Sequence, residues 1–265
     1  MTGLAELEAE DAGLEVAGVT VSFAGLTALQ DVSLQVSSGE VVGVIGPNGA
    51  GKTTLLNAVC GFVRPRRGSI RYRGRLLRRH RAHDLARLGI TRTLQGVGLW
   101  PGLTVLENVM EGGQAAVRSD LVSSALGLPR STREEGRLRA RAEELLDRVG
   151  LASFGGRTPG SLPYGLQKRA ALARALAAEP SLLLLDEPAS GLGEGDMADL
   201  RFLVRDLGRR MGVLLVEHHM DLVMSVCDRL VVLNFGRVIA AGTPEQIRAD
   251  PEVTVAYLGQ DVVDA

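Results

Sequence analysis

The stretch "EVVGVIGPNGAGKTTLLNAVC", residues 40–60, joins a short apolar run to a glycine-rich loop and then to a helix-forming segment. The run Glu40–Gly46 is almost continuously apolar, which is typical of a strand buried on both faces. The loop Gly46–Thr53 satisfies the pattern G-x-x-x-x-G-K-[ST], and it stands between strand and helix as a phosphate-binding loop requires. The sequence therefore predicts a nucleoside triphosphate site at the end of a buried strand.

Each residue type in this loop has a part in phosphate binding. Glycines let successive backbone N–H groups point at phosphates, and the N-terminus of the following helix adds partial positive charge. We expect Lys52 to hold the β and γ phosphates and the Thr53 hydroxyl to take one Mg²⁺ position. The predicted nucleotide-binding residues are Gly46, Pro47, Asn48, Gly49, Ala50, Gly51, Lys52, Thr53 and Thr54.

Two further apolar runs are similar to the first, Ser181–Glu187 ("SLLLLDE") and Gly212–His218 ("GVLLVEH"). Between them, "DMADLRFLVRDLGRRM" repeats apolar residues at helical spacing. Buried strands joined by a helix predict a parallel sheet with crossover helices, so the fold class is α/β. Ahead of this core, Leu14–Phe23 and Leu26–Val36 alternate apolar with polar residues on either side of Gly25, which predicts an antiparallel pair.

Asp186 and Glu187 end the second apolar run, where open α/β sheets place their ligands. We expect Asp186 to contact Mg²⁺ directly or through water, and Glu187 to polarise the attacking water as general base. The alternative is a strand end with two solvated acids. Four leucines before the pair and a proline after it favour the site.

The composition limits the class of protein. The chain has 265 residues, 45% of them hydrophobic, so it can bury a large core. Its net charge of -1 gives no general attraction to nucleic acid or to an anionic membrane. Cys60 and Cys227, far apart and without a C-x-x-C motif, are expected to be buried thiols. The acidic start "MTGLAELEAEDAG" and the absence of a run of about 18 apolar residues predict a soluble chain without a signal peptide.

The segment Arg64–His83 is the most basic part of the chain and raises the question of nucleic-acid binding. Tyr72 is its only aromatic residue, so it lacks the interleaved rings of a base-stacking surface. We therefore expect no nucleic-acid partner. Its arginines are expected on a solvated face, with His80 and His83 at the surface.

Three further stretches carry a family resemblance: "LPYGLQKRAALARAL", "LLLLDEPASGL" and "LLVEHHMDLVMSVCDRLVVLNFGRVIAAGTPEQI". Together with the phosphate loop, they resemble the ATP-binding cassette of an ABC transporter from about Leu14 to Gly259. The resemblance implies a P-loop NTPase fold with a mainly parallel core, an N-terminal antiparallel β subdomain and a helical insert. It also implies ATP hydrolysis, with ATP and Mg²⁺ as cofactors.

The expected organisation is a single cassette between two tails. The tails are residues 1–13 and 260–265, and the cassette is residues 14–259. Within the cassette, residues 14–95 and about 171–259 are expected to form the nucleotide-binding core. Residues from about 96 to 170 are expected to form the helical signature subdomain, because helical stretches there are punctuated by "GLP", "GG" and "TPG".

The resemblance also implies roles for single residues. Phe23 matches the aromatic that stacks on adenine, although an aromatic in a strand is nearly as often ordinary core. Gln95 matches the glutamine that senses Mg²⁺ and the attacking water; a solvent-exposed strand-end glutamine is the alternative. His218 matches the switch histidine that contacts the γ-phosphate. His219 stands where many relatives have aspartate, and because adjacent strand residues point to opposite faces, no metal site is expected on both histidines.

The signature segment departs from the family pattern. In ABC dimers each ATP lies between the P-loop of one subunit and the signature L-S-G-G-Q of the other. At the first four positions this chain has Leu162, Pro163, Tyr164 and Gly165, so the serine is missing and the first glycine is replaced by a bulky residue. A hydrogen bond to a charged phosphate stabilises by roughly 1.5 to 3 kcal/mol. In a heterodimer, the loss of this hydrogen bond can be confined to one of the two ATP sites. Alternatively, backbone N–H groups near Gly165 bind the phosphate, and Pro163 is present because proline suits the start of a helix.

Within the family, "FAGLTALQDVSLQV", "GITRTLQGVGLWPGLTVLENV" and "GTPEQIRADPEVTVAYLG" resemble ATP-binding subunits of branched-chain amino-acid uptake systems and their relatives for amides or urea. This branch implies a second, different ATPase subunit, two transmembrane permease subunits and an extracytoplasmic binding protein. The implied location is the cytoplasmic face of the inner membrane. The alternatives are the ATPase of a lipid or lipopolysaccharide exporter, which usually keeps the signature serine, and a soluble cassette ATPase, which usually has paired cassettes.

Two positions have open interpretations. Trp100, shortly after Gln95, is either an exposed anchor in the groove that receives a permease helix or a packed residue of the helical insert. Gly193 occupies the place of an aspartate that many relatives use for communication across the dimer. Asp196 either substitutes for it from three residues on or caps a helix that begins near Met197.

Overall fold

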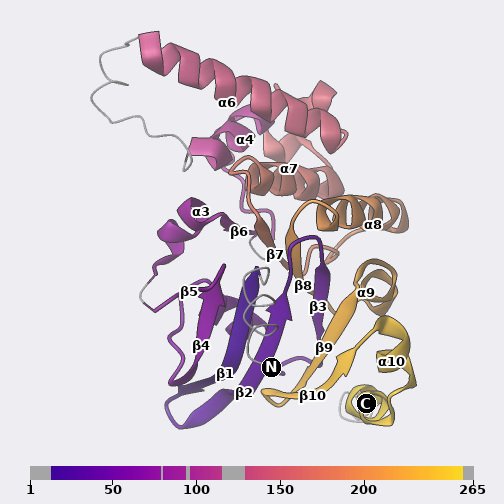
Figure 1. Ribbon diagram of the computed structural model, residues 1–265. Coiled ribbons are helices and arrows are strands. Elements are labelled where there is room, and N and C mark those ends of the chain that lie inside the picture. The colour runs from indigo at the N-terminus through magenta and orange to yellow at the C-terminus, as the bar shows by residue number, and fades with distance from the viewer. Residues whose placement is uncertain (1–12, 79, 94–95, 115–128, 259–265) are drawn as a thin grey trace.

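The computed structural model describes residues 13–78, 80–93, 96–114 and 129–258. Two sheets form the body of the molecule, and a group of helices extends beyond one end of the larger sheet (Figure 1). The expected N-terminal tail, except for Gly13, and the expected C-terminal tail lie outside the described residues. Cys60 and Cys227 are both buried free thiols, as expected.

The smaller sheet is antiparallel and has the strand order β2-β1-β4-β5. The predicted pair is confirmed: β1 covers Leu14–Phe23, β2 covers Leu26–Val36, and Leu14 pairs with Val36. The other two strands are β4 (Arg67–Tyr72) and β5 (Arg75–Leu76). Alternating residues of β1 are buried, which follows from the apolar and polar alternation in its sequence.

The larger sheet has the order β10-β9-β3-β8-β7-β6, and all neighbours pair in parallel except β10 and β9. Every residue is buried in β3 (Val41–Ile45), β7 (Leu182–Asp186) and β8 (Gly212–Val216). These are the three apolar runs of the sequence, so the α/β prediction is confirmed. The remaining strands are β6 (Ile90–Arg92), β9 (Arg229–Asn234) and β10 (Arg237–Gly242).

Side chains of the parallel strands enter two hydrophobic cores in alternation. Leu182 and Leu184 of β7 face the core shared with the antiparallel sheet, where Leu55 of the helix α2 (Lys52–Val59) is also buried. Leu183 and Leu185 face the opposite core, which is covered by the predicted crossover helix α8 (Glu194–Gly208). The period-two alternation of a strand explains why the β7 leucines must all be apolar.

The described part of the expected insert is mostly helical. Its helices are α4 (Val105–Gly113), α6 (Pro129–Arg148) and α7 (Tyr164–Leu176), which lie together beyond the sheets (Figure 1). Most of their buried apolar residues belong to the same core as α8, so the insert continues the core of the sheet. Single turns of 3₁₀ helix occupy Ala82–Asp84, Ala152–Phe154 and Pro159–Ser161.

The remaining helices of the described residues are short: α3 (Leu85–Leu88), α9 (Met220–Val226), α10 (Pro244–Ala249) and α11 (Pro251–Leu258). The capping box between Thr243 and Gln246 starts α10, and Pro244 occupies its first turn. Across the described ranges, none of the helices has the length and apolar character needed to cross a membrane.

Candidate nucleotide site

The glycine-rich loop connects β3 to α2 at the carboxyl edge of the parallel sheet. Gly51 is the N-cap of α2 with a φ of 105°, a left-handed value that only glycine adopts without strain. A Cβ atom added at Gly46 would lie 2.1 Å from the backbone oxygen of Leu233, so a side chain has no room there. The loop is also tied to the β9–β10 turn, because the Gly236 N–H donates to the Ala50 oxygen at 3.0 Å. These contacts fix the loop in front of the helix N-terminus.

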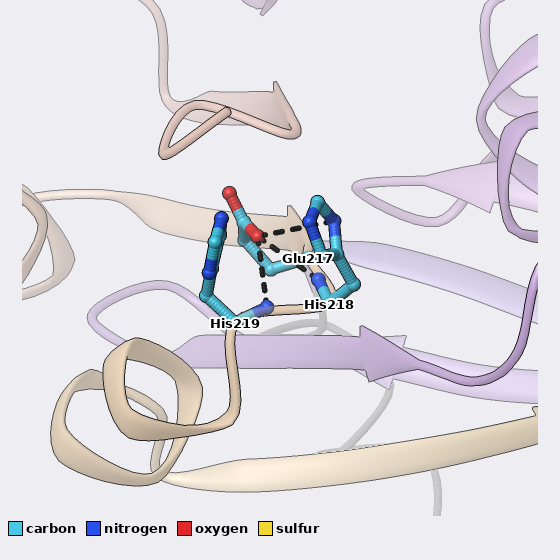
Figure 2. Close-up of side chains that lie close together, drawn as sticks. All are labelled: Glu217, His218 and His219. Carbon is cyan, nitrogen blue, oxygen red and sulfur yellow. Dashed lines mark hydrogen bonds and ion pairs between the residues drawn. The ribbon is translucent and has the colours of Figure 1, made fainter. Parts of the chain in front are cut away.

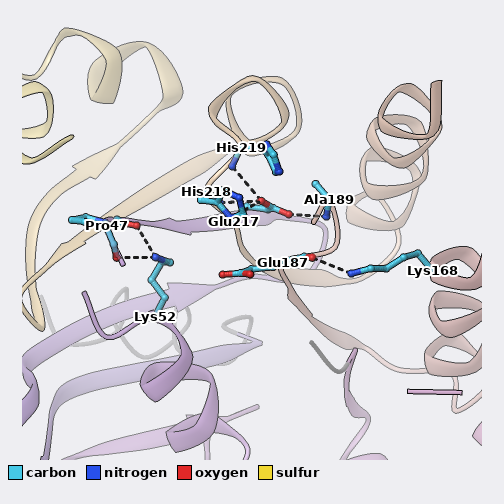
Figure 3. A network of polar contacts seen from close by, with 9 residues as sticks. Pro47, Lys52, Lys168, Glu187, Ala189, Glu217, His218 and His219 are labelled. Carbon is cyan, nitrogen blue, oxygen red and sulfur yellow. Dashed lines mark hydrogen bonds and ion pairs between the residues drawn. The ribbon is translucent and has the colours of Figure 1, made fainter. Parts of the chain in front are cut away.

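Lys52 is the buried cation of this loop. Its Nζ donates to the backbone oxygens of Gly46 at 2.6 Å and Pro47 at 2.9 Å (Figure 3). Burial lowers the pKa of Lys52, while Glu187 and other nearby carboxylates oppose this shift. An ammonium held on the loop by two neutral carbonyls can form stronger, charge-assisted bonds with phosphate oxygens. The Thr53 side chain beside it is exposed.

The carboxylates at the end of β7 lie near the same loop. Asp186 is buried, and its Oδ2 accepts a hydrogen bond from the guanidinium of Arg92 at 2.7 Å. Arg92 also donates to Asn57 Oδ1 at 2.7 Å, so it joins β6 and β7 to the helix α2. Arg92 was not among the residues predicted for this site. Its only sequence signal was a charged residue at the end of a short apolar stretch, which any surface strand would show.

The oxygen donors at this edge fit Mg²⁺. The Thr53 hydroxyl and the Asp186 carboxylate are hard ligands of the kind that Mg²⁺ prefers. Thr53 belongs to the phosphate-binding loop, and Asp186 is close enough to that loop to oppose the lowering of the Lys52 pKa by burial. Gln95, the third predicted metal contact, lies outside the described residues.

Glu187 follows β7 and has an unusual backbone. Its φ is 47°, a left-handed value that is uncommon for residues other than glycine and asparagine. Its N–H donates to the Val216 oxygen at 2.9 Å, and its carbonyl oxygen accepts from Ser190 N–H at 3.2 Å. A backbone held in such a conformation fixes the direction in which the side chain leaves the turn.

The switch segment follows β8 and includes Glu217, His218 and His219. The prediction that the two histidines point to opposite faces is wrong, because their ring centroids are 4.3 Å apart (Figure 2). The strand β8 ends at Val216, so strand alternation no longer applies. Instead, one oxygen of Glu217 accepts the backbone N–H groups of His218 at 2.9 Å and His219 at 3.2 Å and turns the chain. Glu217 was likewise not among the predicted site residues.

Ligand atoms of Glu217, His218 and His219 lie within 4.8 Å of one another, which is close enough for the three residues to hold one metal ion. Glu217 is fully buried, and its other oxygen accepts the Ala189 N–H at 2.7 Å (Figure 3). The Glu217 carboxylate therefore already accepts hydrogen bonds from three backbone N–H groups. Its role is to link the turn after Glu187 to the segment that carries His218.

Several predicted surface and binding residues can now be placed. Phe23 is 47% exposed at the end of β1, so it is not an ordinary core residue. Trp100 is 62% exposed, which excludes the alternative that it is packed inside the helical insert. His83 lies at the surface, but the expectation for His80 is wrong: it is half-buried because its Nε2 bonds to the Val59 oxygen at 2.8 Å. The other residue missed by sequence reasoning here is Asn108, which is fully buried beneath Trp100.

The signature segment begins the helix α7. Pro163 is the N-cap, one residue before the helix, and Tyr164 is 41% exposed. The interpretation of Asp196 as a helix cap is wrong, because α8 begins at Glu194 and its N-cap is Gly193. The Asp196 carboxylate instead packs against Gly165, where an added Cβ would lie 2.2 Å from Oδ2, and it pairs with Arg169 at 3.1 Å.

Comparison with known proteins shows to which family the chain belongs. The family described as "ABC transporter" matches residues 29–190, which is more than half of the chain. The chain is a member of the ABC transporter ATPase family. A second family, described as "Branched-chain amino acid ATP-binding cassette transporter", matches residues 237–263 of this ABC ATPase.

Individual relatives match almost the whole ABC ATPase. The high-affinity branched-chain amino acid transport ATP-binding protein BraF of Pseudomonas aeruginosa is 41% identical, covering 93% of this chain and 98% of its own. LivG of Escherichia coli, with the same description, is 40% identical over the same shares. The lipopolysaccharide export system ATP-binding protein LptB of Haemophilus influenzae is 36% identical, covering 90% and 94%.

Solved structures agree with the fold. A nucleotide-free ATP-binding cassette from an ABC transporter superposes with a TM-score of 0.80 at 28% identity, covering 93% of this chain and 98% of its own. The ADP conformation of an ABC transporter cassette gives a TM-score of 0.81 at 29% identity, covering 94% of this chain and 99% of its own. The predicted fold class and the prediction of an ATP-binding, ATP-hydrolysing transporter subunit are therefore confirmed.

Proposed function

We propose that this ABC ATPase powers the import of branched-chain amino acids or related small polar molecules. The observation that carries the proposal is the near full-length similarity to BraF and LivG, together with the C-terminal match at residues 237–263. The similarity to LptB is lower, which makes lipopolysaccharide export the second candidate. The expected location is the cytoplasmic face of the inner membrane, with substrate delivered to the permease by an extracytoplasmic binding protein.

A groove between the nucleotide-binding core and the helical insert suits a permease segment. Its volume is about 250 Å³, and its walls come from the turn after α2 and from α3, β6, α4 and α7. Phe62 on its rim is 61% exposed, and Arg174 at its other side donates to the Gly98 oxygen at 2.6 Å. Exposed aromatic and arginine side chains are typical anchors of protein interfaces. Two permease subunits would each dock on one ATPase subunit of a heterodimer.

The nucleotide site supports ATP hydrolysis by groups with separate tasks. Lys52 and the N–H groups of residues 46–53 bind the phosphates, the Phe23 ring stacks on the adenine, and Thr53 and Asp186 would hold Mg²⁺ together with Gln95. Bound Mg²⁺ supplies positive charge to the β and γ phosphates. Glu187 accepts a proton from the attacking water, and the exposed His218 imidazole contacts the γ-phosphate.

The sequence of the signature segment supports two ATP sites of unequal activity in the ATPase dimer. Pro163 offers no hydroxyl, and Tyr164 occupies the position of the first signature glycine. Leu162, Pro163, Tyr164 and Gly165 would face the ATP of the partner ATPase subunit, so the missing bond weakens that site alone. The site built on this chain's own P-loop and Glu187 keeps its catalytic groups. A solved cassette dimer bound to ADP and Pi, with a TM-score of 0.73 at 26% identity and coverage of 87% of this chain and 98% of its own, is compatible with pairing of this fold.

Steady-state ATP hydrolysis tests the unequal sites. The chain would be purified alone and together with the second ATPase and the permease subunits of its host. We expect little hydrolysis by the chain alone, loss of most activity of the assembly with Glu187→Gln, and a change under about twofold with Pro163→Ser. Rapid hydrolysis by the isolated chain as a homodimer would contradict the heterodimer.

Uptake into proteoliposomes tests the substrate class. The assembly with its binding protein should accumulate radiolabelled leucine in an ATP-dependent manner, and glutamate should serve as the control solute. Stimulation of hydrolysis by lipopolysaccharide without leucine uptake would favour the second candidate instead.

A further inference from the structure

The first two turns of α7 contact the turn that follows Glu187. Lys168 Nζ donates to the backbone oxygen of Glu187 at 3.3 Å (Figure 3). The same ammonium lies 5.5 Å from the centroid of the Tyr164 ring, which is the distance of a cation–π contact. Tyr164 in turn covers Gly191, where an added Cβ would lie 2.9 Å from the ring. One helix therefore contacts both ends of the segment from Glu187 to Gly191.

The contact falls on the carbonyl oxygen of Glu187, the residue that carries the proposed catalytic carboxylate. Glu187 has a φ of 47°, and its carbonyl oxygen is shared between Lys168 Nζ and Ser190 N–H. A left-handed backbone of this kind persists only when its neighbours hold it. Loss of the Lys168 contact removes one of the neighbours that hold this backbone, and a change in the backbone angles of Glu187 redirects its side chain.

The residue type at position 168 is itself informative. The chain has 30 lysines and arginines, of which only Lys52 and Lys168 are lysines. One holds the phosphate-binding loop, and the other contacts the turn of Glu187. A lysine ammonium is a compact donor that reaches a single carbonyl oxygen, whereas the neighbouring Arg169 forms ion pairs with Asp196 and Asp199.

We propose that Lys168, supported by the Tyr164 ring, is a positioning residue for the catalytic carboxylate Glu187. Through this pair, a movement of the signature segment changes the direction of the carboxylate in the same chain. The substitution of a signature glycine by Tyr164 then has a function inside its own subunit. The inference rests on the proposed role of Glu187 as general base.

The first test is turnover of the assembled transporter. Lys168→Met should lower kcat about tenfold while the KM for ATP changes less than about twofold, because the phosphate-binding loop is untouched. Lys168→Arg should stay within about threefold of the wild type, since a guanidinium can both donate to the carbonyl and stack on the ring. Arg209→Met, which removes an exposed positive charge at the end of α8, is the control and should leave kcat unchanged.

Double substitution tests whether the pair acts as one unit. Tyr164→Leu should lower kcat more than Tyr164→Phe does, because phenylalanine keeps the aromatic ring beside Lys168. The variant with both Lys168→Met and Tyr164→Leu should be no slower than the slower single variant, because the second change removes a contact already lost. Multiplied losses would overturn the coupling.

A readout without turnover is available because the chain has two lysines. Protein with ¹³C-labelled lysine should give two Cε resonances, and the one that disappears in Lys168→Arg belongs to Lys168. Its attached protons should be shifted upfield by the Tyr164 ring, and Tyr164→Leu should remove the shift. An unshifted Lys168 signal in the wild type would contradict the geometry even if a variant failed to assemble.

The outcomes separate this inference from the proposed function. If Glu187→Gln leaves turnover intact, the general-base role fails and the inference falls with it. If Glu187→Gln abolishes turnover but Lys168→Met does not lower kcat, the base stands and only the positioning role is overturned.

Discussion

Lys52 shows how one buried charge serves a ligand site. It is 6% exposed, and its Nζ is satisfied by the Gly46 and Pro47 oxygens. Among the described residues, no carboxylate is in direct contact with this ammonium. A buried ammonium of this kind contributes little to folding, because its desolvation offsets its hydrogen bonds. The presence of lysine here is therefore explained by phosphate binding and not by stability.

Lys52→Met separates these two effects. We expect ADP affinity to fall about 10- to 100-fold, since one or two charge-assisted bonds to phosphate are lost. The unfolding midpoint should stay within a few degrees of the wild type, because methionine has a similar shape and no charge to bury. Calorimetric titration with ADP and thermal unfolding measure both. A loss of folding equal to the loss of binding would contradict this division of roles.

At the scale of elements, the helices α7 and α8 approach each other closely at Gly165, which has no side chain. Gly165 of α7 lies directly against the Asp196 carboxylate of α8, and Arg169 one turn later pairs with the same carboxylate. The close approach of the two helices therefore depends on the missing Cβ at Gly165.

Gly165→Ala should destabilise the protein by about 1 to 3 kcal/mol, because Asp196 must move and its pair with Arg169 is disturbed. Gly136→Ala, in α6, is the matched helical control, since nothing lies within 4 Å of an added Cβ there. It should stabilise by about 0.5 to 1 kcal/mol through helix propensity. Urea unfolding measures both variants, and equal effects would show that the α7–α8 contact does not matter.

Asn108 holds the loop that carries Trp100 onto α4. It is fully buried; its Oδ1 accepts from Trp100 N–H at 2.7 Å, and its Nδ2 donates to the Trp100 oxygen at 3.1 Å and the Thr104 oxygen at 2.9 Å. Asn108→Leu should cost about 2 to 4 kcal/mol, because the loop's backbone groups lose buried partners. Hydrogen exchange should become faster at residues 100–104, whereas the exposed Gln114→Ala should leave it unchanged.

At the scale of the whole molecule, the two sheets are joined by a charged pair as well as by their shared core. Arg229 of β9 donates to the Glu40 carboxylate at 2.6 Å and to the Gln35 oxygen of β2 at 2.8 Å. Burial raises the pKa of Glu40, but the hydrogen bonds from Arg229 and from the Ser37 N–H outweigh this effect and lower it.

The lowered pKa makes this link sensitive to acid. The ionised carboxylate stabilises the fold above the usual glutamate pKa of 4.5, and the contribution is lost as the pH falls through the lower folded value. Because Arg229 is 41% exposed, we expect Glu40→Gln to cost only about 1 kcal/mol, or roughly 2 to 4 °C in Tm, at pH 7.

Thermal unfolding from pH 7 to pH 3 measures this dependence. The Tm values of the wild type and Glu40→Gln should converge in the acid range. Glu143→Gln, which removes an exposed ion pair with Arg139 on α6, should change Tm little at any pH. Parallel curves for wild type and Glu40→Gln would contradict the link.

Much of the fold and part of the candidate site were predictable because their signals are local. The three buried strands and the β1–β2 pair follow from apolar runs and alternation within each segment. The opposite-face prediction for His218 and His219 failed because it assumed that the strand continued past Val216, whereas the Glu217 carboxylate turns the chain there. The cap assigned to Asp196 failed because the helix starts at Glu194, which spacing alone does not fix.

The sequence by itself determined the phosphate-binding loop, the acidic pair after β7 and the α/β class, since each of these features is encoded in residues that are neighbours along the chain. Only the tertiary structure decided which distant groups surround them: Arg92 on Asp186 from 94 residues away, Glu217 on Ala189 from 28, and Lys168 on Glu187 from 19. The physical reason is that strand order and helix packing bring these partners together, and neither is encoded in the spacing of the residues that meet.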